Sequence, residues 1–270
     1  MQGMSRAASG RRQRKRRAIG GRHIAALAAL VAIAGVGGWF LLLRSDEPSG
    51  PPTAAIVDQL SLTFPNEEFV QDATAKLEAA GYTVDYYPGE EVTVNFYRRL
   101  PTRGYDVILF RSHADRLLTE TPAGELVDEV ILFTSEPYTT ERYQSDQAAN
   151  DLVIARYRDG GEPYFGIGAG FIDNGDNGAG DYDGATIIMM GCEGLLSERT
   201  AEAFVGRGAE VYISWDETVS AAHTDAATGV LLQHLLIEGL PAGDAVALTM
   251  AELGPDPFYG SELAVYPAPG

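Results

Sequence analysis

Short apolar runs alternate with segments of helical periodicity along most of the chain. Apolar, partly β-branched runs bounded by turn residues are typical of buried strands, and apolar positions spaced three and four apart are typical of helices. We therefore predict strands at 54–61, 82–87, 105–111, 187–190, 210–215 and 263–266. The helices between them are predicted at 67–80, 91–100, 198–208, 221–238 and 244–253.

This alternation predicts an α/β fold, because strands separated by helices usually pair in parallel and carry helices on their faces. Residues 114–183 are less regular. Here we expect a hairpin arm at 129–136, a short helix or strand at 148–158, a strand at 164–172 and a loop at 173–183. The loop lacks the acidic spacing of a calcium site, and no metal or other cofactor is expected.

The N-terminus follows a different pattern. A basic tail (1–23) precedes an uncharged, apolar segment (24–43), a linker (44–53) and the α/β domain (54–270). About 20 apolar residues span a bilayer, so 24–43 predicts one transmembrane helix. The basic tail predicts that the N-terminus is cytoplasmic and the domain extracytoplasmic. A cleaved signal peptide is the alternative, but the apolar run is long for one and no small-x-small cleavage site follows it.

The net charge of −18 is unevenly distributed along the chain. Residues 1–44 contain nine Lys or Arg and no Asp or Glu, so all 38 acidic side chains lie beyond them. A domain this acidic repels nucleic acid, which argues against nucleic-acid binding. The single cysteine, Cys192, excludes an intrachain disulfide framework.

Two reactive side chains follow predicted strands. Cys192 comes just after the strand at 187–190, and His113 just after the strand at 105–111. If these strands are neighbours in a parallel sheet, both side chains emerge at the edge where ligands usually bind. A thiolate is a nucleophile and a nearby imidazole can accept its proton, while Gly191 leaves space for a substrate. A lone cysteine is also often a small core residue, so the spacing alone leaves that role open.

These segments resemble the caspase-like cysteine peptidases, which include caspases, metacaspases, gingipains, separase and the bacterial CHAT proteases. Residues 107–113 and 187–192 look like the two strand ends that carry the catalytic His and Cys of that family. Residues 190–194 resemble the Ala-Cys-Glu-Thr-Gly run of CHAT proteins, and 208–215 a later segment there that ends in Trp. The resemblance implies a three-layer caspase-hemoglobinase-like fold with a mostly parallel sheet, in which His113 is the general acid/base and Cys192 the nucleophile.

Two positions bear on activity and specificity. Ala114 stands where the family usually has a glycine whose N–H helps to form the oxyanion hole; alanine still supplies that N–H, but its side chain could narrow the site. Asp216 stands where caspases have the arginine that selects aspartate, so an acid here would favour Arg or Lys in the substrate. Glu217 and Asp225 could contribute, and a capping or surface role is the alternative for Asp216.

The sequence therefore predicts a membrane-anchored, caspase-like cysteine endopeptidase that acts on a peptide or protein substrate. One alternative is a catalytically silent caspase-like domain that binds a partner at the cell surface. Another is a flavodoxin-like domain in which Cys192 belongs to the core. The remaining histidines, His23, His223 and His234, lack the spacing of a zinc site.

Overall fold

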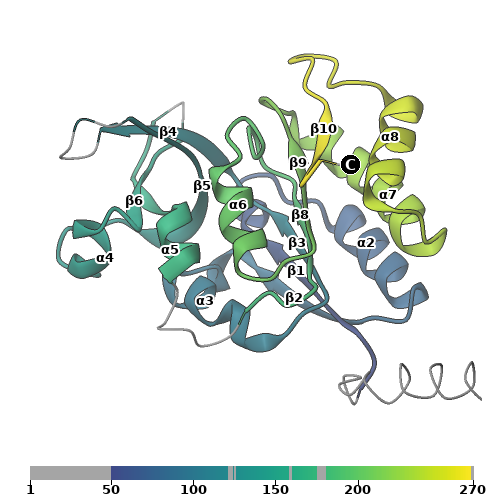
Figure 1. Ribbon diagram of the computed structural model, residues 1–270, viewed down its shortest axis with the longest axis horizontal. Coiled ribbons are helices and arrows are strands. Elements are labelled where there is room, and N and C mark those ends of the chain that lie inside the picture. The colour runs from purple at the N-terminus through teal and green to yellow at the C-terminus, as the bar shows by residue number, and fades with distance from the viewer. Residues whose placement is uncertain (1–49, 121–123, 125, 158–159, 175–180, 269–270) are drawn as a thin grey trace, which may run out of the picture. The chain divides into compact units, whose positions relative to one another are not determined.

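A six-stranded sheet lies at the centre of the protein (Figure 1). The computed structural model describes residues 50–268, apart from 121–123, 125, 158–159 and 175–180. All neighbouring strands of this sheet pair in parallel except β10, which pairs antiparallel with β9 at one edge. The spatial order is β10 (Leu263–Tyr266), β9 (Val211–Trp215), β8 (Thr186–Met189), β3 (Val107–Arg111), β1 (Thr53–Asp58) and β2 (Thr83–Pro88).

Helices cover both faces of this sheet (Figure 1). One face carries α2 (Glu67–Ala79), α7 (Ala221–Leu232) and α8 (Ala242–Leu253), and α7 continues as a π-helix over Gln233–Ile237. The core on the other face is built with α3 (Val94–Arg99), α5 (Ala169–Asn174) and α6 (Arg199–Gly206). The other helical segments in the described part of the chain are α4 (Gln144–Ala148) and the short 3-10 turns Gln59–Leu62, Gly89–Glu91 and Leu100–Arg103.

A second, antiparallel sheet follows β3 in the chain. Its spatial order is β4 (Ala114–Glu120), β5 (Leu126–Pro137), β7 (Tyr164–Ile167) and β6 (Leu152–Ala155). The predicted arm at 129–136 lies within β5, and β6 resolves the choice between helix and strand at 148–158. The predicted strand at 164–172 is wrong beyond Ile167, because α5 begins at Ala169, whose N–H donates to the buried carboxylate of Glu129 at 2.8 Å.

The central strands supply two cores because successive side chains point to opposite faces of a sheet. On β3, Ile108 and Phe110 lie in the core beside α3 and α6, whereas Val107 and Leu109 lie in the core beside α2 and α7. With both faces covered, these strands are apolar throughout, as buried parallel strands usually are. This explains why the apolar pattern predicted their positions.

A buried ion cluster connects this sheet to α7. Arg111 and Asp58 are paired across β3 and β1, on the face that α2 and α7 cover. The Arg111 guanidinium donates to Asp58 at 2.8 Å, to Asp225 of α7 at 2.8 and 2.9 Å, and to the Phe64 carbonyl at 2.8 Å. Burial raises the pKa of Asp58. Burial alone would lower the pKa of Arg111, but the hydrogen bonds to both carboxylates raise it.

The predicted membrane anchor at 24–43 lies outside the described residues. Within residues 50–268, as far as they are described, no helix combines the length and apolar character that crossing a bilayer requires.

We predict that the Arg111→Met substitution lowers the free energy of unfolding by about 3–5 kcal/mol, because it leaves two buried carboxylates without their cation. Urea denaturation followed by circular dichroism measures this loss. Arg116→Met is the control, since the Arg116–Asp128 ion pair is partly exposed and such pairs contribute little. Similar losses in the two variants would contradict a special role for the buried cluster.

Candidate active site

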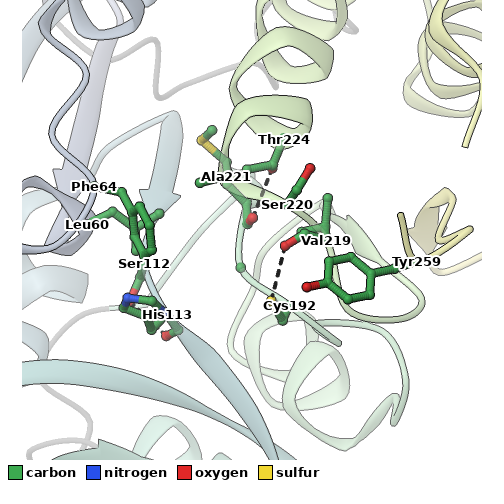
Figure 2. A pocket seen from close by; sticks show the side chains of 12 residues that line it. Leu60, Phe64, Ser112, His113, Cys192, Val219, Ser220, Ala221, Thr224 and Tyr259 are labelled. Carbon is green, nitrogen blue, oxygen red and sulfur yellow. Dashed lines mark hydrogen bonds between the residues drawn. The ribbon is translucent and has the colours of Figure 1, made fainter. Parts of the chain in front are cut away.

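His113 and Cys192 follow adjacent strands of the central sheet. The parallel strands β3 and β8 are in register, with Phe110 beside Met189, so the residues after them emerge at the same edge. Both side chains line one hollow of about 290 Å³ and a second of about 520 Å³. Figure 2 shows them on opposite sides of the first, smaller hollow.

The His113 ring is oriented by contacts on several sides. Its Nε2 lies 3.0 Å from the Thr63 hydroxyl, and its ring meets Tyr157 edge-on at 4.7 Å between centroids. Gln59 accepts the backbone N–H of His113 at 3.0 Å and donates to the Tyr157 hydroxyl at 3.1 Å. Orientation of a base by a third group is one part of the nucleophile–base arrangement used in covalent catalysis.

Cys192 lies in the turn that follows β8 and is partly exposed. Its thiol donates to the Val219 carbonyl, with Sγ 3.5 Å from the oxygen. The next residue, Glu193, has a φ of 62°, which is strained for a residue other than glycine. Its buried carboxylate accepts from the Thr218 hydroxyl at 2.9 Å and from the backbone N–H of Arg116 at 3.2 Å. These two bonds hold the strained turn, and with it the cysteine.

The N–H of Ala114 lies on the edge of β4 that faces this turn. Phe133, directly opposite His113, donates its N–H to the His113 carbonyl, which fixes the alternation of hydrogen-bonding directions along β4. In an antiparallel ladder the next residue, Ala114, then points its N–H away from β5. Arg116 has the same orientation, and its N–H reaches Glu193. The alternation therefore directs the Ala114 N–H away from β5, on the same edge of β4 as the N–H of Arg116.

Gly191 allows the turn to approach the end of β3 closely. A Cβ atom at this position would lie 2.5 Å from the Ser112 carbonyl oxygen and 3.1 Å from the Ala114 methyl. Gly194 is equally constrained, since its Cβ would lie 1.9 Å from the Ser214 hydroxyl. Both glycines therefore serve close packing around Cys192.

The acidic residues considered for binding Arg or Lys lie outside both hollows. The Asp216 carboxylate accepts the backbone N–H of Glu262 at 2.8 Å, next to β10. Asp225 is bound by Arg111, as described above, and Glu217 is an exposed residue whose carbonyl accepts from Glu193. The structure thus brings His113, Ala114, Gly191 and Cys192 together and leaves Asp216 elsewhere.

The segment 254–260 forms one wall of the site and was not predicted from the sequence. Tyr259 lines both hollows, and Ser220 lines the smaller one. Buried Asp256 joins them: it accepts the N–H and hydroxyl of Ser220 at 2.9 and 2.6 Å and the N–H groups of Phe258 and Tyr259 at 2.8 and 2.9 Å. The signal available in the sequence was a pair of aromatic residues in a loop between Pro257 and Gly260.

The described part of the chain contains no group of three His, Cys, Asp or Glu side chains suited to a metal ion. His234 lies 2.9 Å from both Glu238 and Glu252, and His223 packs beside Trp215 with ring centroids 5.4 Å apart. Neither histidine lines the hollows that contain Cys192.

We predict that Gly191→Ala slows the reaction of Cys192 with a peptide-like electrophile and lowers stability, because the new methyl group collides with the Ser112 carbonyl. Thiol-labelling rates and thermal unfolding measure both effects. Gly206→Ala in α6 is the control, since a Cβ there meets nothing within 4 Å. A Gly191→Ala protein with native labelling and stability would show that the close approach is unnecessary.

Asp256 gives a pH-dependent prediction. Burial alone would raise its pKa, but the bonds from Ser220, Phe258 and Tyr259 lower it to about 2. A carboxylate with a lowered pKa stabilises the fold above its unfolded pKa, near 4, and loses that effect as the pH falls toward 2. Asp256→Asn should therefore cost about 1–2 kcal/mol at pH 7 and progressively less below pH 4. Unfolding curves at several pH values measure this, and a cost independent of pH would contradict it.

The chain matches no protein-family model and no curated protein. Among solved structures it is similar to the crystal structure of protein GSU0716 from Geobacter sulfurreducens, with 13% sequence identity and a TM-score of 0.36. That match covers 81% of this chain and 95% of the other. A TM-score this low does not establish a shared fold.

Proposed function

We propose that the protein is a membrane-anchored, caspase-like cysteine endopeptidase. The observation that carries the proposal is that His113 and Cys192, at the ends of adjacent parallel strands, line the same two hollows. The mostly parallel sheet, with helices on both faces, supports the three-layer caspase-hemoglobinase-like fold that the sequence motifs imply.

The proposed chemistry proceeds through a thioester. His113 accepts the thiol proton, and the Cys192 sulfur attacks the peptide carbonyl carbon. The N–H of Ala114 stabilises the oxyanion that forms on the carbonyl oxygen. His113 then gives its proton to the departing amine as the carbon–nitrogen bond breaks. Water, deprotonated by His113, hydrolyses the thioester and restores the thiol.

The proposed cellular arrangement rests on residues 1–43. The basic tail would stay in the cytoplasm and the apolar segment would anchor the chain, so that the domain acts on peptides or proteins outside the membrane. The preference for Arg or Lys is not part of this proposal, because none of the acidic residues on which it depended lines the hollows.

We predict that Cys192→Ala abolishes cleavage of a fluorogenic peptide library, and that His113→Ala lowers kcat/KM at least ~100-fold because acid–base catalysis is lost. His234→Ala is the matched control, since this histidine lies outside both hollows. Full activity in Cys192→Ala would refute the nucleophile assignment. Full activity in His113→Ala would refute its role as the acid/base.

A second candidate is a catalytically silent domain that binds a partner. The observation behind it is Ala114, which stands at the position where caspase-like peptidases usually have glycine. Its methyl group lies next to Gly191, within the site. Labelling with a peptide chloromethyl ketone separates the two candidates. Labelling of Cys192 that depends on His113 supports the peptidase, and its absence in correctly folded protein supports the silent domain.

A further inference from the structure

The smaller hollow beside Cys192 is lined by uncharged side chains apart from the titratable His113. The residues around it include Phe64, His113, Cys192, Ala221 and Tyr259. Its volume of about 290 Å³ lies at the lower limit for small-molecule sites. The hollow therefore has room for one side chain of a substrate, with the reactive sulfur at its border.

Two carboxylates close to this hollow in the chain bind other partners, and the charged residues Asp115 and Arg156 line the larger hollow instead of this one. Asp225, next to Thr224, accepts two hydrogen bonds from Arg111. Asp256, three residues before Tyr259 in the chain, accepts four hydrogen bonds from backbone and hydroxyl donors. Neither carboxylate is among the residues that line the hollow. A basic side chain that entered the hollow would therefore lose its hydration without forming an ion pair with a carboxylate that lines it.

We propose that this hollow binds an uncharged, apolar side chain adjoining the scissile bond, of the size of leucine, methionine or phenylalanine. This inference rests on the peptidase function proposed above and adds its substrate class. Burying an apolar side chain against apolar surface is favourable, whereas burying an unpaired ion is costly. Aspartate and glutamate are also disfavoured by the acidic charge of the whole chain.

Two aromatic residues form opposite walls of the hollow. Phe64 comes from the loop after β1 and Tyr259 from the segment before β10, and Figure 2 shows them on either side of the space. Both are more than half exposed, so their rings are available to an incoming side chain. Asp256 accepts the backbone N–H of Tyr259 and so holds the backbone of this residue beside the hollow. Tyr259 is therefore the specificity-determining residue of the hollow.

The first test compares kcat/KM over a peptide library that varies the residues on both sides of the scissile bond. We expect Leu, Met or Phe at one of these positions to exceed Arg, Lys, Asp and Glu at least ~10-fold. Tyr259→Ala should lower kcat/KM for the apolar peptides ~10-fold or more, mainly through KM. Phe258→Ala is the matched control, because this neighbouring aromatic is exposed and lies outside the hollow.

The second test introduces an acid into the hollow. Ala221 lines it and is the first residue of α7, where a negative charge is compatible with the helix. Ala221→Asp should shift the preference toward Arg and Lys at least ~10-fold. Ala222→Asp is the control, since Ala222 is exposed and does not line this hollow.

The outcomes separate this inference from the proposed function. Cleavage that prefers Arg, Lys, Asp or Glu overturns the inference and keeps the peptidase. If the wild-type protein cleaves no peptide, binding of the same peptides to the Cys192→Ala variant tests the inference. A preference for apolar side chains that the Tyr259→Ala substitution abolishes supports the hollow as a binding site without peptidase activity. Binding that is absent or independent of the side chain overturns the inference as well.

Discussion

The buried guanidinium of Arg111 fixes the relative positions of the elements that build the candidate site. It contacts the end of β1 through Asp58, the following loop through the Phe64 carbonyl, and α7 through Asp225. Exchanging a buried ion cluster for apolar residues often costs no stability. The contribution of the cluster here is to position residues of the site. Phe64, whose carbonyl binds Arg111, lines the hollow, and His113 lies two residues after Arg111 at the end of β3.

A second constraint acts on the other side of the hollow, in the turn that carries Cys192. Gly191 lets the turn approach β3, and the backbone of Glu193 adopts a conformation that L residues disfavour. The hydrogen bonds that the Glu193 carboxylate accepts, from Arg116 at the edge of β4 and from Thr218, offset the cost of this strained backbone. Strain of this kind persists only where surrounding contacts determine it. The turn that carries Cys192 is thereby tied to β4 and to Thr218.

The sequence predicted the central strands well because burial on both faces makes them continuously apolar. The sequence did not predict β4, because this edge strand of the smaller sheet has a mixed pattern of polar and apolar residues. The predicted strand at 164–172 extended β7 into α5, because both segments contain apolar residues. His113 and Cys192 could be found because they directly follow buried strands. Thr63, Gln59 and Tyr259 could not, because long-range contacts bring their loops to the site.

The acidic composition has a structural use near the site that a count of charges does not reveal. Four carboxylates there are buried and accept hydrogen bonds from the protein itself: Asp58, Glu193, Asp225 and Asp256. A carboxylate that already accepts these hydrogen bonds positions the residues around a hollow and has little capacity left to bind a basic side chain of a substrate. Asp216, from which the preference for Arg or Lys was inferred, lines neither hollow, and that preference stays a prediction. The smaller hollow next to Cys192 offers an apolar and aromatic surface, whereas the larger one also contains the charged side chains of Asp115 and Arg156.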